Sequence, residues 1–286
     1  MKALTDGRVI KAVASKFFVD TNDGVKVCFA RKKLKCDGNI FVGDFVSIAR
    51  DRDSFVIEEV KPRKNKLIRP YVSNVDICFI VIACEPQPDY LLVDKIIVNC
   101  HEQGIHPILI VNKCDISEVD VSEYLSVLDI VECSSQTGVG VDKIVYASLG
   151  KTVCFAGQSA VGKSSIINAV LGSDLLEVGE LAKKIKRGKN TTRRTEILSL
   201  AGGTYLVDTC GFSMLEAVDV EPESLRLYFD DLEEFRPQCR FNTCTHVDEP
   251  DCAVKPHVGY EIGVGRYERY KSIFNELKER REKRYQ

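Results

Sequence analysis

The stretch KTVCFAGQSAVGKSSIINAVLG, residues 151–172, decides the fold. Residues 151–157 form an apolar run typical of a buried strand, and residues 164–172 have helical spacing that ends in glycine. The loop between them, GQSAVGKS at 157–164, fits the pattern GxxxxGK[ST]. A strand before this motif and a helix after it are the context that a phosphate-binding loop requires. The segment therefore predicts a phosphate site at the edge of an α/β sheet.

Each residue type in this loop has a chemical reason. Glycines let successive backbone N–H groups converge on phosphate oxygens, and the helix N-terminus adds partial positive charge. Lys163 is expected to reach the β and γ phosphates as a catalytic group, and the Ser164 hydroxyl to bind Mg²⁺. The loop residues expected to contact nucleotide are Gly157, Gln158, Ser159, Ala160, Val161, Gly162, Lys163, Ser164 and Ser165.

A second motif indicates which base is bound. Asn112, Lys113, Cys114 and Asp115 follow the apolar stretch HPILIV. An aspartate carboxylate accepts protons from N1 and from the exocyclic amine of guanine, and adenine offers no such pair. Residues 133–136 (CSSQ), after another apolar stretch, are expected to supply backbone amides to guanine O6, with Ser134 and Ser135 among the nucleotide contacts. Alone, each motif is equally an ordinary turn; beside a phosphate loop they predict a GTP site.

Magnesium elements are expected further along the chain. Asp208 ends the strand-like run TYLVD, where it can hold the hydration shell of Mg²⁺, and the Gly211 N–H can sense a γ-phosphate. Thr191 and Thr192 lie in a basic segment that reads as a nucleotide-ordered switch.

The order of the motifs is permuted, because the base-reading elements precede the phosphate loop. The same site can form in a circularly permuted fold, since strand ends at one sheet edge need not follow chain order. Strands alternating with helices from about residue 71 predict a parallel α/β sheet.

The N-terminal segment has a different pattern. Residues 1–70 read as about five short strands, which predicts a small barrel of the OB type; an SH3-like barrel would look much the same. They hold 16 Lys and Arg against 9 Asp and Glu, although the whole chain carries a net charge of −2. A basic module predicts contact with a polyanion. Residues 61–70 read as a linker.

A Cys/His cluster lies near the C-terminus. Cys239, Cys244, His246 and Cys252 offer three thiolates and an imidazole, the donor set of a closed, structural zinc site. The short polar segment that carries them has little apolar content, so the metal would supply its folding energy. Residues 215–238 look acidic and helical, and a charged helix is expected from about Tyr260.

Composition narrows the class of protein. With 44% hydrophobic and 29% charged residues, the chain reads as a globular protein. The N-terminus has no signal-peptide pattern and no apolar run is long enough to cross a bilayer, so we expect a cytoplasmic protein with no membrane partner. The other nine of the 12 cysteines read as small buried hydrophobes rather than a disulfide framework.

Taken together, the motif order, the basic barrel and the Cys/His cluster resemble one family over essentially the whole chain: the circularly permuted GTPase of small ribosomal subunit biogenesis. The resemblance implies a multidomain chain with an OB-like RNA-binding domain (1–68), a permuted P-loop GTPase domain (69–214) and a helical zinc-binding domain (215–286). It implies GTP hydrolysis stimulated by the ribosome late in assembly of the 30S subunit, with Mg²⁺ and one Zn²⁺. Binding to 16S rRNA as a monomer is expected with it.

One departure concerns catalysis. The family usually places a histidine before the switch threonines to position the attacking water, whereas this chain has Asn190 there, and Phe212 follows Gly211. An amide can orient water but cannot become a cation, so weak intrinsic hydrolysis is expected. A nucleotide-stabilised RNA-binding module without hydrolysis is the alternative, and an ATP-dependent kinase is a third reading that Asp115 argues against.

Overall fold

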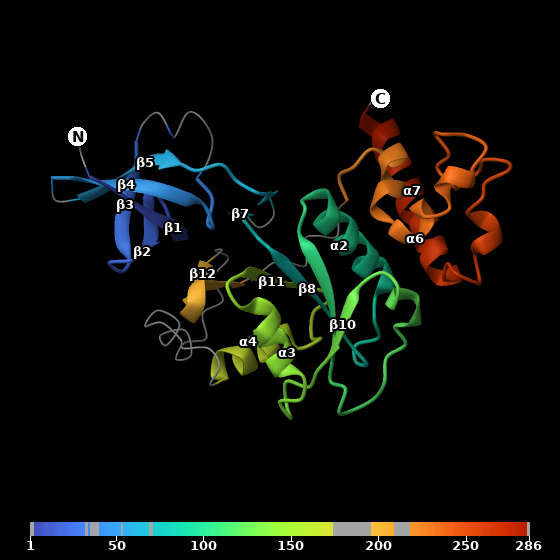
Figure 1. The fold of residues 1–286 in the computed structure, drawn as a ribbon, viewed down its shortest axis with the longest axis horizontal. Helices are drawn as coiled ribbons and strands as arrows, with labels where there is room; N and C mark the ends of the chain where they lie inside the picture. The colour runs from blue at the N-terminus through green and yellow to red at the C-terminus, as the bar shows by residue number, and fades with distance from the viewer. Residues whose placement is uncertain are drawn as a thin grey trace.

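The computed structural model describes residues 3–31, 34, 40–52, 54–68, 71–173, 196–208 and 218–284. Figure 1 shows three parts: a strand-rich N-terminal part, a central sheet with helices, and a helical C-terminal part. Within the described ranges, no helix is both long and apolar enough to cross a membrane.

The N-terminal part is a closed five-stranded barrel. Strand β1 pairs with both β2 and β4, β2 with β3, and β3 with β5 in parallel, while β4 and β5 close the circuit. Its strands are β1 Leu4–Val13, β2 Lys16–Thr21, β3 Lys26–Ala30, β4 Phe45–Asp51 and β5 Ser54–Val60. Alternate side chains fill its own small core, for example Val9, Cys28 and Ile57. The expected OB-like barrel is confirmed.

The central part is a six-stranded sheet in the order β10-β9-β8-β11-β13-β12. Neighbours along β10, β9, β8, β11 and β13 run parallel, and β12 pairs antiparallel with β13 as a hairpin. The strands are β8 Ile77–Ala83, β9 His106–Asn112, β10 Asp129–Glu132, β11 Thr152–Ala156, β12 Glu196–Leu200 and β13 Thr204–Asp208. Strand β8 is buried along its whole length, which explains its unbroken apolar sequence.

Helices cover both faces of this sheet. The helices are α2 Tyr90–Glu102, α3 Val141–Ser148 and α4 Lys163–Gly172, with a short 3₁₀ turn at Ser122–Tyr124. Side chains of α2 pack on one face with Cys78, Ile80 and Cys154. Side chains of α3 and α4 pack on the other face with Phe79 and Phe155. The predicted parallel α/β sheet is confirmed.

Barrel and sheet are joined through a buried arginine. Arg8 of β1 is 2% exposed. Its guanidinium donates to Thr152 Oγ1 at 2.7 Å and to Asn74 O at 3.1 Å. Lys11 of β1 also pairs with Glu196 of β12, with 2.8 Å between Nζ and Oε2. The two parts therefore share hydrogen bonds and one continuous strand order.

The segment predicted as a linker is more ordered than its polar sequence indicates. Strands β6 Lys66–Ile68 and β7 Tyr71–Ser73 form a two-stranded hairpin. Asn65 bonds both the N–H and the C=O of Val75 through its side chain, and the Asn74 side chain accepts from Lys64 N–H at 2.9 Å. The side-chain amides of these two asparagines thus supply backbone hydrogen bonds next to the hairpin, in a segment whose composition alone indicates a loop.

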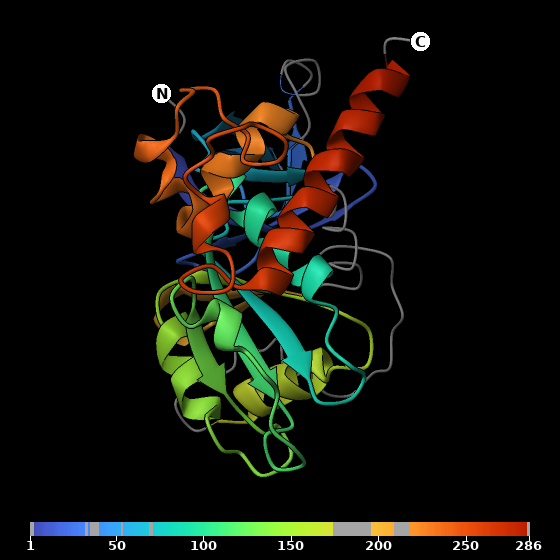
Figure 2. The same ribbon diagram turned by 90° about the vertical axis from the view of Figure 1, so that its right-hand side faces the viewer.

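The C-terminal part is built around one long helix, α7 Val264–Arg284, which crosses α2 in Figure 2. The helix begins four residues later than expected, because Gly259 adopts φ +92° and Val258 bridges Ile262 ahead of it. The acidic stretch before the Cys/His cluster is mostly short turns rather than α-helix. These are η4 Pro222–Tyr228, α6 Asp230–Glu233 and η5 Arg236–Gln238, with η6 Lys255–His257 after the cluster.

Candidate functional site

The expected nucleotide motifs converge on one edge of the sheet. The carboxyl ends of β9, β11 and β10 lead directly into residues 112–115, 157–162 and 133–136. Because these strands are parallel, their carboxyl ends lie on the same side of the sheet. The structure thus brings together three stretches that the chain carries in permuted order.

The phosphate loop depends on two glycines. Gly157 has φ +121°, and a Cβ there would lie 2.2 Å from Val81 O. Gly162 has φ +96°, and its Cβ would lie 2.3 Å from Asn112 Nδ2. Only glycine combines these dihedral angles with such close approach. The loop therefore packs closely against β8 at Gly157 and against the base-reading motif at Gly162.

Lys163 begins α4 with its side chain folded over the loop. Its Nζ donates to Gly157 O at 2.7 Å and also to Gln158 O. Burial lowers the pKa of the Lys163 ammonium group, which marks a partly desolvated cation. An anion bound at this helix N-terminus would offset that desolvation. Ser164 and Ser165 lie exposed on the first turn of the same helix.

Asn112 ties two of the stretches together. Its side chain is buried, with Nδ2 donating to Val161 O at 2.9 Å and Oδ1 accepting from the Ser135 N–H at 3.2 Å. One amide thus joins the phosphate loop to the loop that follows β10. Its role here is to position both loops.

Lys113 and Asp115 lie on the same turn. Lys113, with φ +65°, donates from Nζ to Ala160 O at 3.2 Å and also to Glu85 O. Its stem therefore extends toward the phosphate loop. Asp115 is exposed, and its carboxylate makes no hydrogen bond to another described residue. Such a carboxylate is available to a base lying over the turn, while Cys114 donates its backbone N–H to Cys133 O at 3.2 Å.

The loop after β10 uses most of its own amides. The N–H groups of Ser134 and Ser135 donate to Val139 O at 2.9 Å and to Asn112 Oδ1. Those of Thr137 and Gly138 donate to Ser134. Within residues 133–136, the Gln136 N–H is the backbone donor left without an acceptor.

Most of the residues expected to bind magnesium lie outside the described part of the chain. Asn190, Thr191, Thr192 and Gly211 lie outside the described residues, and only the backbone of Asp208, the last residue of β13, is described. The exposed Ser164 hydroxyl at the start of α4 has the position and chemistry of a Mg²⁺ ligand.

One residue of the phosphate loop has an unfavourable backbone conformation. Ala160 has φ +66°, and the left-handed region costs an L-residue about 1–2 kcal/mol. Ala160→Gly relieves this strain but adds about 0.5–1 kcal/mol of unfolded-state entropy. We expect a net stabilisation of about 0.5 kcal/mol, measured by urea unfolding. Ala147→Gly, at a half-buried position in the last turn of α3, is the opposite control and should destabilise; a less stable Ala160→Gly protein would contradict the strain argument.

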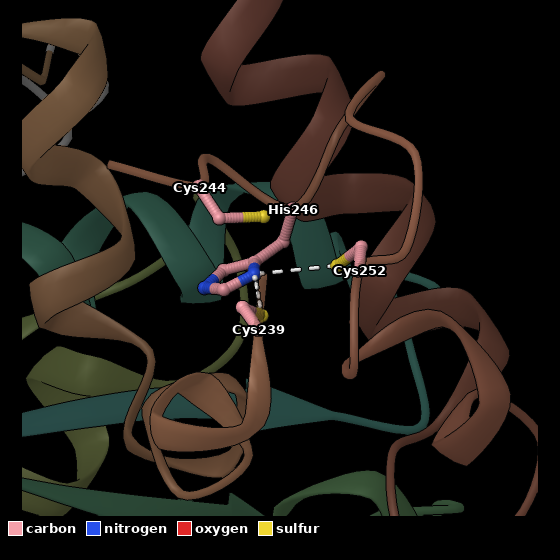
Figure 3. A group of neighbouring side chains, drawn as sticks. All are labelled: Cys239, Cys244, His246 and Cys252. Carbon is pink, nitrogen blue, oxygen red and sulfur yellow. Dashed lines mark hydrogen bonds between the residues drawn. The ribbon is translucent and has the colours of Figure 1, made fainter. Parts of the chain in front are cut away.

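The Cys/His cluster forms a second site. Figure 3 shows Cys239, Cys244 and Cys252 directed toward His246 Nδ1. The four ligand atoms lie within 4.8 Å of one another, and Nδ1 is 3.4 Å from Cys252 Sγ and 3.6 Å from Cys239 Sγ. This group of side chains can hold a metal ion, and three sulfurs with one imidazole suit tetrahedral Zn²⁺.

The surroundings fit that metal. Burial raises the pKa of the Cys244 thiol to about 12, a cost that binding of the thiolate to a cation would repay. Burial also lowers the pKa of His246, which favours the neutral imidazole that metals bind. His246 Nε2 is buried without a hydrogen-bond partner and lies 4.0 Å from Glu233 Oε1. A carboxylate behind the non-ligating nitrogen is the usual outer partner of a metal-bound histidine.

Two further side chains hold the metal-binding loop. Burial opposes ionisation of Glu249, but hydrogen bonds from Thr245 and Val247 outweigh it and lower the pKa of this carboxyl to about 2. Tyr267 of α7 donates to His246 O at 2.7 Å. The loop is thereby attached to the long helix.

Sequence reasoning missed several of these residues. Glu233 and Glu249 have no spacing motif, because their partners are set by the folded loop. Gln87 and Asp89, which bond Gln158, follow the carboxyl end of β8. That strand lies beside β11 in the sheet. The position of Gln87 and Asp89 after the carboxyl end of a parallel strand is therefore the sequence feature that could have placed them near the site.

Known proteins resemble this chain over nearly its full length. A family model described as RsgA GTPase matches residues 60–218. A protein of Caldanaerobacter subterraneus named small ribosomal subunit biogenesis GTPase RsgA is 39% identical, covering 98% of both chains. A protein of Thermotoga maritima with the same name is 38% identical, covering 92% of this chain and 93% of its own.

Two solved structures share the fold. YjeQ from Thermotoga maritima has a TM-score of 0.84 and 33% identity, covering 96% of this chain and 99% of its own. YloQ, described as a circularly permuted GTPase, has a TM-score of 0.80 and 31% identity, covering 97% of this chain and 96% of its own.

Proposed function

This chain belongs to the RsgA GTPase family, and we propose that it acts as a GTP hydrolase in biogenesis of the small ribosomal subunit. The observation that carries the site assignment is the Asn112 side chain, which joins the phosphate loop to the loop after β10. The family assignment does not favour an RNA-binding module without hydrolysis.

The geometry supports the following roles for the nucleotide-site residues. We assign phosphate binding to the backbone of residues 157–165 and to Lys163, whose desolvated ammonium group would stabilise charge that develops on the γ-phosphate. Asp115 would accept from the guanine N1–H and amine, with Lys113 and Cys114 shaping that turn. Because the N–H groups of Ser134 and Ser135 already donate to Val139 O and to Asn112 Oδ1, we assign the contact with guanine O6 to the Gln136 N–H.

Magnesium would be held by Ser164 together with Thr191, Thr192 and Asp208, and Gly211 would contact the γ-phosphate. When bound, the ion offsets the negative charge on the phosphates. Asn190 remains our candidate for orienting the attacking water through its amide. An Asn190→Ala protein with unchanged ribosome-stimulated turnover would remove it from the mechanism.

The test of the function is GTP turnover by the full-length, metal-loaded chain with and without purified small ribosomal subunits. We expect acceleration of tenfold or more, which corresponds to about 1.4 kcal/mol in the activation barrier. Single-turnover rates that are the same with and without subunits would contradict a ribosome-stimulated GTPase.

We further propose that residues 1–68 bind 16S rRNA, that 69–214 and 215–286 form the GTPase and zinc-binding domains, and that the chain works as a cytoplasmic monomer with one Zn²⁺ on the Cys/His cluster. Support for rRNA binding comes from the basic surplus of the barrel and from the outer side of β3. There the side chains of Val27 and Phe29 are 42% and 38% exposed. An exposed aromatic side chain on a strand suits a stacked base, and the basic surplus of the barrel suits phosphates.

A prediction follows for RNA binding. Affinity for a fragment of 16S rRNA should fall steeply with salt, because Lys and Arg displace counterions from phosphates. Phe29→Ala should weaken binding by about 1–3 kcal/mol with an unchanged salt slope, since it removes stacking rather than charge. Fluorescence anisotropy measures both quantities. Tyr146→Ala, an exposed aromatic on α3, is the control, and salt-independent binding would contradict the interface.

A further inference from the structure

The phosphate loop is fastened to a segment outside the nucleotide motifs. Gln158 Oε1 accepts from the Asp89 backbone N–H at 2.9 Å, and Gln158 Nε2 donates to Gln87 O at 3.2 Å. Both ends of one amide thus bond a single three-residue stretch. This stretch follows β8 and is the entry to α2.

The same stretch begins α2. The Asp89 carboxylate accepts from the Leu92 N–H at 3.0 Å as the N-cap of the helix. A single residue therefore receives Gln158 through its backbone and caps α2 through its side chain. Any displacement of the Gln158 amide acts directly on the first turn of α2.

Helix α2 in turn carries the C-terminal part. Asp94 is 0% exposed and accepts from Arg266 Nη1 at 2.6 Å and from Arg269, both on α7. One residue further on, Lys95 donates to Glu276 of α7 at 2.6 Å between Nζ and Oε2. Val98 lies in the hydrophobic core of the C-terminal part. Figure 2 shows α7 lying across α2.

We propose that Gln158 is a positioning residue that couples nucleotide occupancy of the phosphate loop to docking of the C-terminal part, residues 218–284, through α2. The inference rests on the proposed nucleotide site and deepens it. Buried ion pairs at Asp94 join α2 to α7, so we expect a shift of α2 to displace α7 with it, whereas the contact with Gln158 is two neutral hydrogen bonds at the edge of the site. The coupling is therefore expected within the usual 5- to 150-fold range, and it acts in both directions.

Hydrogen exchange on the full-length, metal-loaded protein tests one direction. Saturating GDP should slow amide exchange in residues 157–172 and also in α7. In Gln158→Ala at saturating GDP, the slowing in 157–172 should remain while the slowing in α7 is lost. A merely structural role for Gln158 would not separate these two regions. Equal slowing of α7 in both proteins would overturn the inference.

GDP dissociation measured with a fluorescent GDP analogue tests the other direction. Lys95→Met loosens the α2–α7 contact and should speed dissociation several-fold in the parent protein, but not in the Gln158→Ala background. Gln103→Ala is the matched control for Gln158→Ala. Like the Gln158 side chain, the Gln103 side chain accepts from a backbone N–H, that of Lys66, but at the far end of α2. If the double variant speeds GDP dissociation by the product of the factors for Lys95→Met and Gln158→Ala alone, the two residues are not coupled and the inference is overturned. Absent GDP uptake by the parent protein would instead contradict the proposed function itself.

Discussion

Asp115→Asn should change the nucleotide preference of this protein from GTP to xanthosine triphosphate. The Asp115 carboxylate is exposed at the carboxyl end of β9, on a turn that Asn112 and Lys113 attach to the phosphate loop. Guanine offers it two N–H donors, and an asparagine amide would present an N–H to the exocyclic amine instead. We expect GTP affinity to fall about 100-fold or more, since a buried polar contact is left mismatched. Xanthine carries a carbonyl at that position, so it should regain the bond.

Calorimetric titration with GDP and xanthosine diphosphate measures this exchange. Glu118→Gln is the matched control, because it neutralises an exposed carboxylate three residues along the same loop. It should leave the preference for guanine unchanged. If Asp115→Asn binds GDP as tightly as the parent protein does, residues 112–115 do not read the base.

Much of this site could be predicted because its signals are local. A glycine-rich loop between an apolar strand and a helix is visible within residues 151–172. Parallel strands present their carboxyl ends at one edge, so motifs that follow strands are brought together whatever their order in the chain. The spacing of Cys239, Cys244, His246 and Cys252 is likewise local, and the structure places their ligand atoms within 4.8 Å of one another.

The contacts that sequence patterns do not show join residues far apart in the chain. Arg8 has the charge of a surface residue, yet it is buried between barrel and sheet because three oxygen acceptors from distant segments meet it. Gln158 was expected to contact the nucleotide, whereas its side chain holds the start of α2. Neither residue belongs to a periodic pattern, so burial and partner choice appear only in the folded chain.

The C-terminal part shows how a local site acquires long-range consequences. Cys244 and Cys252 belong to the same hydrophobic core as Tyr270 and Ile273 of α7. Tyr267 and Tyr270 also donate to the backbone carbonyls of His246 and Thr245. A metal that fixes the loop would therefore also fix the side of α7 that faces it. Since α7 docks on α2 through Asp94, a metal bound there would support the contact with the GTPase sheet as well.

Cys252→Ser should accordingly abolish metal binding and unfold the C-terminal part. Structural zinc contributes about 10–16 kcal/mol to folding of small zinc modules at pH 7, and the loop that carries Cys252 has few apolar side chains to replace it. We expect zinc content to fall from one ion per chain to near zero, measured by metal analysis. Thermal unfolding followed by circular dichroism should show residues 218–284 unfolding in a separate transition at a lower temperature. GDP binding should be retained, because the sheet has its own cores. A strong chelator added to the parent protein should give the same result.

Cys84→Ser is the control, because Cys84 is half-buried outside the cluster, and it should keep the ion. A Cys252→Ser protein that retains one zinc per chain and unfolds as the parent does would show that this cluster is not the metal site.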